Sequence, residues 1–282
     1  MSYNISSDKF QHPLLKPILQ KLTEYFSKED IRFFVIGATA RDIIMQLHDE
    51  KSGRATHDLD IAISINNWDD YRKIEEGIVN IEGFEKDTTQ KQRFIFQGIF
   101  ILDIVPFGEV MKEDDKIFWP PEEEIAMSVL GFSEVYENTE PVKIDGEIEI
   151  EVAPLAGIFI LKIVAWLDRY MKGNKDADDM AFIIINYLNI YMERAVADQY
   201  DLYEVDDFDM NTAGSRLIGR DISTLLSNYE STKIKVSNIL KSEVEKEEGS
   251  ILINQITDTH SGLKYDLVLE CLQQIILGLN ED

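Results

Sequence analysis

The first third of the chain alternates between helical and strand patterns of apolar residues. From Leu14 to Phe26, apolar residues recur every three or four positions, which predicts an amphipathic helix. A short apolar run over 33–36 ends at Gly37 and is typical of a buried strand. The pattern then predicts a helix, a strand and a second helix, over 38–47, 57–65 and 68–78.

Strand patterns continue to about residue 152. They cover 93–97, 99–105, 126–135, 142–144 and 148–152. The first two runs meet at Gly98, and Pro106 is expected to end the second because proline donates no ladder hydrogen bond. Asp145-Gly146 predicts a hairpin turn between the last two. We expect all of these strands to extend one sheet.

Beyond Pro154 the apolar periodicity is helical throughout. The predicted helices cover 155–171, 176–191, 212–227, 232–247 and 262–279. The change of pattern predicts a domain boundary at this point. We expect a mixed α/β domain over residues 1–153, followed by a helical domain over residues 154–282.

The composition indicates a folded and strongly acidic protein. With 282 residues, of which 44% are hydrophobic, the chain is long enough to bury a substantial core. Its 28 basic and 53 acidic residues give a net charge of −25, which repels phosphate backbones at long range and attracts cationic partners. A nucleic-acid substrate would therefore need a local basic patch.

Other features predict a cytoplasmic protein with no membrane-spanning segment. The single cysteine, Cys271, has no partner for an internal disulfide, as expected in a reducing compartment. No apolar stretch reaches the ~20 residues that cross a bilayer. The first residues of the chain lack the basic start and apolar core of a signal peptide.

Asp103 interrupts the otherwise apolar strand pattern of 99–105. An ionised carboxylate in a strand buried on both faces costs several kcal/mol unless a cation accompanies it. Asp103 is therefore a candidate metal ligand. The alternatives are that it lies at a frayed strand end or pairs with a surface lysine.

A second acidic motif lies in the strand predicted over 57–65. Residues two apart in a strand share a face, so the side chains of Asp58 and Asp60 lie close enough to bind one ion. Mg²⁺ suits such a pair, since it takes hard oxygen ligands and leaves positions open for water and phosphates. A pair of this kind also caps turns in many proteins, so its context decides between the two interpretations.

That context is a glycine at a strand-to-helix junction. Gly37 and the unpaired amides of the following helical turn form an anion site suited to a triphosphate. Arg41 adds charge to this site, unless it faces solvent or pairs locally. Arg54 offers a guanidinium beside the acidic motif, for either phosphate contact or support of the carboxylates.

The order of these motifs resembles the polymerase-beta-like nucleotidyltransferases. Such proteins have a glycine motif, a helix, an Asp-x-Asp strand and a third carboxylate on a separate strand. The segments VIGATARD (35–42) and RATHDLD (54–60) are similar to those of predicted nucleotidyltransferases grouped with AbiEii-type toxins. The similarity continues through LKIVAWLDR (161–169) and KDADD (175–179), and covers about residues 30 to 190.

The resemblance implies a nucleotidyltransferase-fold sheet with flanking helices, followed by a helical C-terminal domain. It implies two Mg²⁺ ions, held by Asp58, Asp60 and Asp103, with an NTP as co-substrate. It also implies catalytic roles for Lys162 and Asp179, on phosphate or the acceptor. The nucleotide-binding residues that it implies are Gly37, Ala38, Thr39, Arg41, Arg54, Arg169, Lys175 and Asp176.

The chain departs from the broader family at Ala38, where many members have serine or glycine. The hydroxyl of Thr39 is the available substitute for that serine. The spacing from Gly37 to Arg41-Asp42 also resembles tRNA CCA-adding enzymes. Their arginine-rich motif does not follow Asp103, and the acidic balance suits bulk tRNA binding poorly.

Three functions fit these observations. The first is an AbiEii-type enzyme that transfers a nucleoside monophosphate to an RNA end, such as that of tRNA, or to a protein, as a toxin held in check by an antitoxin. The second is an aminoglycoside-type nucleotidyltransferase, whose cationic small-molecule acceptor the net charge would attract. The third is an inactive nucleotide-binding scaffold, since a fold alone does not establish activity.

Overall fold

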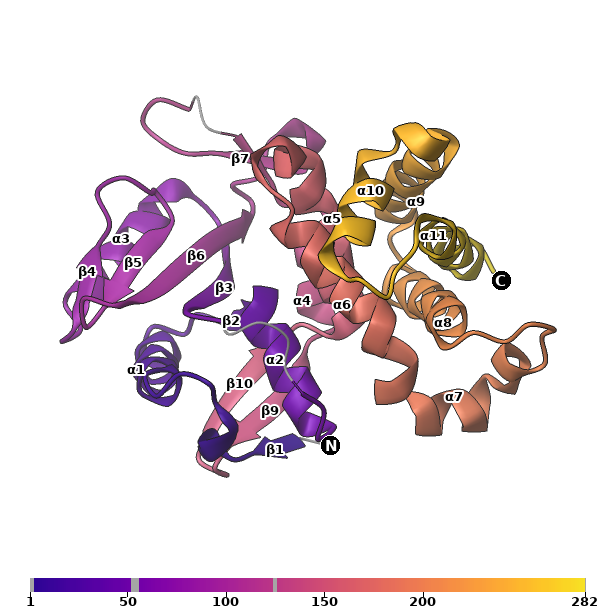
Figure 1. Cartoon of the computed structure of the whole chain (residues 1–282). Helices are drawn as coiled ribbons and strands as arrows, with labels where there is room; N and C mark the ends of the chain where they lie inside the picture. Colours follow the sequence, from indigo (N-terminus) through magenta and orange to yellow (C-terminus); the bar gives the residue numbers. More distant parts are fainter. Residues whose placement is uncertain (1–2, 52–55, 124–125, 282) are drawn as a thin grey trace. The chain divides into compact units, whose positions relative to one another are not determined.

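The computed structural model describes residues 3–51, 56–123 and 126–281. The chain divides into two compact units, Met1–Pro154 and Leu155–Asp282 (Figure 1). No helix within the described ranges is both long and apolar enough to cross a membrane.

The first unit is built on a mixed eight-stranded sheet with the order β1-β9-β10-β2-β3-β6-β5-β4 (Figure 1). Its strands are β1 (Tyr3–Ile5), β2 (Phe33–Ile36), β3 (Asp58–Ile65), β4 (Phe84–Lys86), β5 (Arg93–Phe96), β6 (Phe100–Gly108), β9 (Glu140–Ile144) and β10 (Ile148–Val152). Three neighbouring pairs are parallel, namely β1 with β9, β10 with β2, and β3 with β6. The other pairs are antiparallel. The sequence-based expectation of a mixed sheet is confirmed.

The central strands β3 and β6 are buried because apolar side chains occupy both of their faces. Leu59 and Ile61 of β3, like Leu102 and Ile104 of β6, have no exposed surface. The helices of this unit are α1 (Leu15–Lys28), α2 (Gly37–Leu47), α3 (Trp68–Val79) and α4 (Phe132–Glu137). In this interior an ionised side chain needs a partner, which makes the polar residues at the strand ends informative.

Three expectations about the strands of this unit are wrong. Strand β6 does not stop at Pro106, because β5 pairs with β6 only as far as Asp103, and no β5 partner needs the amide that proline lacks. The strand expected over 126–135 ends at Ser128, and after Gly131, with a φ of +87°, the chain enters α4. The strands β7 (Lys116–Phe118) and β8 (Ala126–Ser128) form a separate two-stranded sheet instead of extending the main one.

The second unit is helical. Its helices are α5 (Leu155–Arg169), α6 (Lys175–Ile190), α7 (Met192–Asp198), α8 (Met210–Leu225), α9 (Glu230–Glu245), α10 (Ile251–Thr259) and α11 (Tyr265–Leu279). Three short 3-10 helices of this unit are described, at Tyr170–Lys172, Tyr200–Tyr203 and Glu247–Gly249, and the described part of the first unit has two, at Ser7–Lys9 and Glu113–Asp115. Helix α10 was not predicted from the sequence, which indicated helices only over 232–247 and 262–279 in this part of the chain. It begins after Ser250, whose hydroxyl accepts a hydrogen bond from the Ile253 amide.

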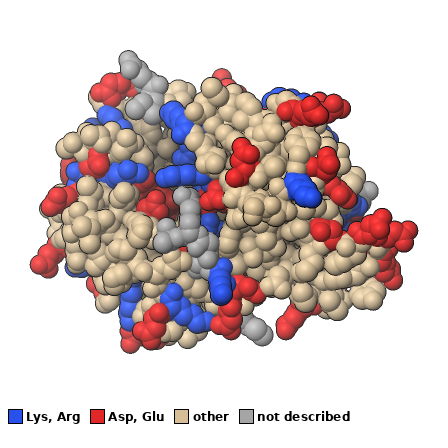
Figure 2. All heavy atoms as spheres, in the orientation of Figure 1, with Lys and Arg blue, Asp and Glu red and all other residues tan. Residues whose placement is uncertain are grey.

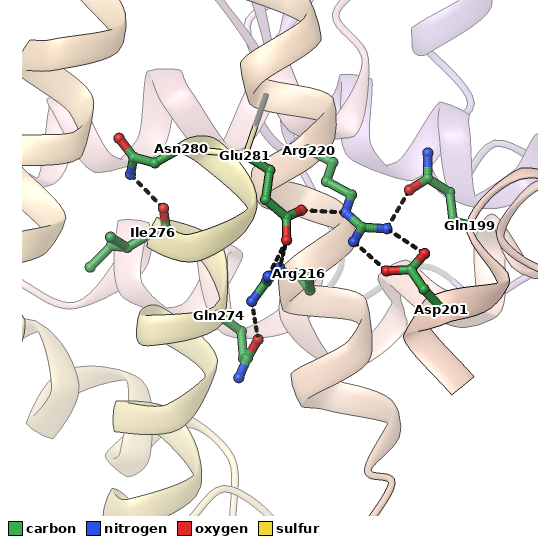
Figure 3. A network of polar contacts seen from close by, with 8 residues as sticks. All are labelled: Gln199, Asp201, Arg216, Arg220, Gln274, Ile276, Asn280 and Glu281. Atoms are coloured by element: carbon green, nitrogen blue, oxygen red, sulfur yellow. Dashed lines mark hydrogen bonds and ion pairs between the residues drawn. The ribbon is translucent and has the colours of Figure 1, made fainter. Parts of the chain in front are cut away.

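The end of the chain is attached to α8 through a polar network (Figure 3). The Glu281 carboxylate accepts hydrogen bonds from Arg216 and Arg220, which lie one turn apart on α8. On its other side, Arg220 bonds the Gln199 and Asp201 side chains. The network therefore joins α8, the segment after α7 and the residues that follow α11.

Candidate active site

Asp60 on β3 and Asp103 on β6 are neighbours in the main sheet. The strands are parallel and the two residues are in register, so their side chains project from the same face. Asp58, two residues earlier on β3, shares that face by strand alternation. Asp103 is buried, whereas Asp58 and Asp60 are partly exposed. The sheet thus brings the three sequence-predicted carboxylates to one face of two adjacent strands.

Gly37 lies directly against Asp60. Strand β2 is antiparallel to β3 and places Ile36 opposite Asp60, and α2 begins at the next residue. The φ angle of Gly37 is +68°, a conformation that glycine adopts without strain. A Cβ atom at this position would lie 2.4 Å from Oδ2 of Asp60. The strand-to-helix junction therefore holds the first turn of α2 close to the carboxylate.

The side chains that follow Gly37 are engaged inside the unit. Ala38 and Thr39 are buried, and the Thr39 hydroxyl donates to the Asp58 carbonyl oxygen at 2.7 Å. Arg41 is 1% exposed and donates to Asp42 through Nε at 3.0 Å and Nη2 at 2.7 Å. Local pairing, one of the two alternatives to phosphate binding for Arg41, is thus what the structure shows. Arg54 lies outside the described residues.

Arg93 is a prominent residue of this face that the sequence reasoning missed. It begins β5, in antiparallel register with Asp103, and donates to both carboxylate oxygens of Asp103. The distances are 2.9 Å from Nε to Oδ1 and 2.8 Å from Nη2 to Oδ2. The hydrogen bond to Asp103 raises the pKa of Arg93 in spite of its partial burial, and the negative charge of Asp60 acts in the same direction. Arg93 is therefore within electrostatic reach of both carboxylates.

A sequence signal for Arg93 existed in the hairpin geometry. A tight connection at Gly98 places Phe96 opposite Phe100, and counting back along both strands then places Arg93 opposite Asp103. The Arg93 guanidinium therefore supplies part of the positive charge that was expected beside Asp103.

The donor set on this face suits magnesium in chemical type. Carboxylate oxygens on adjacent strands are hard ligands, and the missing Cβ of Gly37 leaves room for the Asp60 carboxylate. Within residues 3–51, 56–123 and 126–281, no group of at least three His, Cys, Asp or Glu side chains has the geometry to hold a metal ion. Both oxygens of Asp103 accept hydrogen bonds from Arg93 in this arrangement. The assignment of Asp58, Asp60 and Asp103 as metal ligands therefore stays a prediction.

The second unit contains a separate cluster of predicted site residues, on α5 and α6. Lys162 Nζ lies 2.6 Å from Asp179 Oδ2 and 3.4 Å from Asp176 Oδ1. Arg169 donates to both oxygens of Asp176, at 2.7 and 2.8 Å. Lys175 is exposed at the first position of α6. The structure thus brings four of these five residues into one ion-pair cluster.

The charge state of this cluster follows from its burial and its pairing. Burial by itself would raise the pKa of Asp176, but the Arg169 hydrogen bond and the Lys162 charge outweigh it, so the pKa lies below its ordinary value. Asp176 is therefore ionised at neutral pH. Asp179 is fully buried beside Lys162. An ion-pair cluster of this kind is consistent both with a structural role and with the catalytic one that the resemblance implies.

A comparison with protein families identifies the class of this protein. The model of one family, described as "Nucleotidyl transferase AbiEii toxin, Type IV TA system", matches residues 20–234. The protein is thus a nucleotidyltransferase, with the mixed sheet, flanking helices and helical second part that its sequence predicted. Within that class, the chain belongs to the AbiEii family. The resemblance seen in its motifs is confirmed.

Solved structures show more distant similarity. An antigenic nucleotidyltransferase-like protein from Paracoccidioides brasiliensis is 15% identical, with 71% of this chain and 92% of that chain covered and a TM-score of 0.41. The antibiotic-resistance factor ANT(2'')-Ia is 11% identical, with 67% of this chain and 94% of that chain covered and a TM-score of 0.36. No curated protein matches the chain.

Proposed function

We propose that this protein is a Mg²⁺-dependent enzyme that transfers a nucleoside monophosphate from an NTP to an acceptor hydroxyl. The observation that carries the proposal is the register of Asp60 with Asp103, on the face where Gly37 lies against the Asp60 carboxylate. Adjacent carboxylates beside the start of a helix combine oxygen ligands for a cation with amides for a phosphate.

The transfer forms a bond between the acceptor oxygen and the α-phosphorus, the bond from that phosphorus to pyrophosphate breaks, and the proton of the acceptor hydroxyl is released to solvent. Bound magnesium would neutralise charge on the phosphates and on the leaving group. Asp58, Asp60 and Asp103 would hold the ion. The backbone at Gly37 and the first turn of α2 would position phosphate oxygens. The roles expected for Lys162 and Asp179 stay predictions from the resemblance.

The family description supports a toxin function for this activity. A toxin of this type requires an acceptor in the cell and an antitoxin that restrains it. We propose an RNA end or a protein as the acceptor, and an antitoxin as the partner. The acidic composition, with a net charge of −25, favours an antitoxin with a basic contact surface.

A second candidate is transfer to a cationic small molecule. The net charge of −25 would draw a polycationic acceptor toward the protein. In Figure 2, acidic side chains are spread over the surface that is drawn, with Lys and Arg side chains between them. The acceptor of highest kcat/KM distinguishes this candidate from the first.

Nucleotide transfer tests the proposal directly. The protein is incubated with α-labelled NTPs, Mg²⁺ and either total tRNA, cell protein or a panel of aminoglycosides. We expect one acceptor class to take up label, with Asp60→Asn reducing the rate at least about a hundredfold, because a ligand of the ion is lost. Asp69→Asn is the matched control, since this exposed carboxylate on α3 pairs with the surface residue Arg72.

Label transfer that persists unchanged in Asp60→Asn would contradict the assignment of this face. Absence of label on every acceptor, together with absence of NTP and Mg²⁺ binding, would contradict both transfer functions. Absence of label with NTP binding retained would favour an inactive nucleotide-binding scaffold. The same variants test the toxin function in cells. Expression of the wild type is expected to arrest growth, whereas Asp60→Asn at equal protein level is not.

A further inference from the structure

The guanidinium of Arg93 donates hydrogen bonds to the same two oxygens of Asp103 that would bind a metal ion; this bidentate pair is called the fork. Nε and Nη2 of the guanidinium reach Oδ1 and Oδ2 at 2.9 and 2.8 Å. A bidentate guanidinium–carboxylate pair of this kind is both strong and directional. The side chain of Asp103 is 13% exposed, so little solvent competes for its oxygens.

The position of this pair is set by the sheet and not by a flexible loop. Asp103 lies between β3 and β5, with Asp60 in register on one side and Arg93 in register on the other. The three residues therefore form a row across adjacent strands. In this row, Arg93 is the positive neighbour and Asp60 the negative neighbour of Asp103.

A carboxylate in such a row has two competing partners. Mg²⁺ between Asp60 and Asp103 would bind oxygens that now accept from Arg93, and the guanidinium charge nearby opposes the arrival of a divalent cation. Each oxygen of Asp103 already accepts one hydrogen bond from Arg93, so binding of the ion would weaken or displace that hydrogen bond. The free energy needed to weaken the Arg93–Asp103 hydrogen bonds reduces the net free energy of metal binding.

We propose that Arg93 is a built-in competitor of the metal ion, which holds Asp103 when the ion is absent and thereby weakens the affinity of the site for Mg²⁺. The inference rests on the proposed function, since it takes Asp103 to be a metal ligand. Arg93, which lies outside the sequence motifs, would thereby control how tightly the site binds metal. The guanidinium of Arg93 also neutralises one of the carboxylates of this acidic face.

The opposite role for Arg93 makes the opposite prediction. If Arg93 only supported Asp103 in a metal-binding orientation, removal of the guanidinium would leave the carboxylate misplaced and would weaken metal binding. Competition predicts instead that removal strengthens it. The sign of the change in affinity therefore separates the two roles.

The experiment measures Mg²⁺ affinity of the full chain by calorimetry, without nucleotide. We expect Arg93→Gln to bind Mg²⁺ roughly ten- to a hundredfold more tightly than the wild type, which corresponds to the loss of a charge-assisted fork. Arg93→Lys keeps the charge but loses the fork, so its affinity should lie between the two. Arg72→Gln is the control, because it removes the same charge from an exposed pair with Asp69.

A second measurement guards against a variant that folds poorly. Without metal, Arg93→Gln is expected to melt at a lower temperature than the wild type, since the repulsion between the Asp60 and Asp103 carboxylates is then no longer offset by the Arg93 charge. Added Mg²⁺ should raise its Tm by more than it raises that of the wild type. If Arg93→Gln does not fold, Arg93→Lys is judged by the same two measurements.

The outcomes separate this inference from the proposed function. Equal or weaker Mg²⁺ binding by Arg93→Gln, or by Arg93→Lys if only that variant folds, overturns the competition when the wild type binds Mg²⁺. Absence of Mg²⁺ binding in the wild type and in every variant overturns the metal site itself, and the proposed function with it. Tighter binding in Arg72→Gln as well would show a general effect of net charge and would also overturn the specific role of Arg93.

Discussion

At the scale of single residues, Gly37 meets two requirements at once. Its φ of +68° is in the left-handed region, and its missing Cβ leaves room for the Asp60 carboxylate. Alanine at this position would meet both a strained backbone and an atom 2.4 Å away. Gly98 has a similar φ of +72°, but a Cβ there would meet nothing within 4 Å. Alanine substitutions at these two glycines therefore distinguish the effect of backbone strain from the effect of contact with Asp60.

We predict that Gly37→Ala damages the site beyond its effect on stability. Gly98→Ala should lower the free energy of unfolding by about 1–2 kcal/mol, the cost of a left-handed alanine, and leave transfer unchanged. Gly37→Ala should cost more and also slow nucleotide transfer at least about tenfold, because Asp60 must shift. Urea unfolding followed by circular dichroism gives the stability, and label transfer gives the rate.

Equal behaviour of the two variants would show that Gly37 serves the turn alone. That result would match the interpretation in which this glycine only permits a tight strand-to-helix junction. The close approach to Asp60 would then have no part in positioning the carboxylate.

At the scale of elements, helices α8 and α11 of the second unit are in backbone contact. A Cβ at Gly219 would lie 2.2 Å from the Ile275 carbonyl oxygen, and one at Gly278 would lie 2.2 Å from the Arg216 carbonyl oxygen. Neither helix has room to add a side chain at this crossing. Cys271 on α11 is fully buried, and burial raises the pKa of its thiol to about 12. Its thiol therefore reports whether α11 stays in place.

We predict that Gly278→Ala loosens α11. Overpacking at a backbone contact costs about 1–3 kcal/mol, which should raise the rate of Cys271 modification by a disulfide reagent roughly tenfold. The Cys271 thiolate is the nucleophile that attacks the disulfide of the reagent, and burial raises the pKa of this thiol, so the folded protein should react slowly at pH 8. Gly262→Ala is the control, since a Cβ there would meet nothing within 4 Å.

Rapid modification of Cys271 in the wild type would contradict the burial on which this prediction depends. Similar rates in Gly278→Ala and Gly262→Ala would show that the helix crossing adapts by a small shift. Either result is visible in a single time course, because the chain has one cysteine.

At the scale of the whole molecule, charge is the dominant property. The net charge of −25 creates a long-range field that favours positive partners and disfavours nucleic acid. Salt screens this field, since the Debye length falls from about 30 Å at 0.01 M to about 8 Å at 0.15 M. The effect of salt on KM therefore carries information about the acceptor.

We predict opposite salt effects for the two acceptor classes. Over that range of ionic strength, at constant free Mg²⁺, KM for a cationic small molecule should rise, because screening removes an attraction. KM for an RNA acceptor should fall, because screening removes a repulsion. An RNA acceptor whose KM rises steeply with salt would contradict this and would indicate a basic contact patch that outweighs the net charge.

Much of the fold and part of the site followed from the sequence by itself. Alternation placed Asp58 and Asp60 on one strand face, and the apolar neighbours of Asp103 marked it as a carboxylate that needs a partner. Helical and strand periods also identified most of the elements, along with the hairpin at Asp145-Gly146. These are local properties, because periodicity depends only on residues a few positions apart.

The tertiary structure decided which of these residues meet. Only the pairing of β3 with β6, which are separated in the chain by α3, β4 and β5, brings Asp60 beside Asp103. The register of the β5–β6 hairpin gives Asp103 its partner Arg93, and the extent of that pairing decides that β6 continues through Pro106. Strand pairing joins segments distant in sequence, and the local pattern of each strand does not encode its neighbour. The residues with candidate chemistry were therefore visible in the sequence, whereas the position of Asp60 beside Asp103 was decided by the sheet.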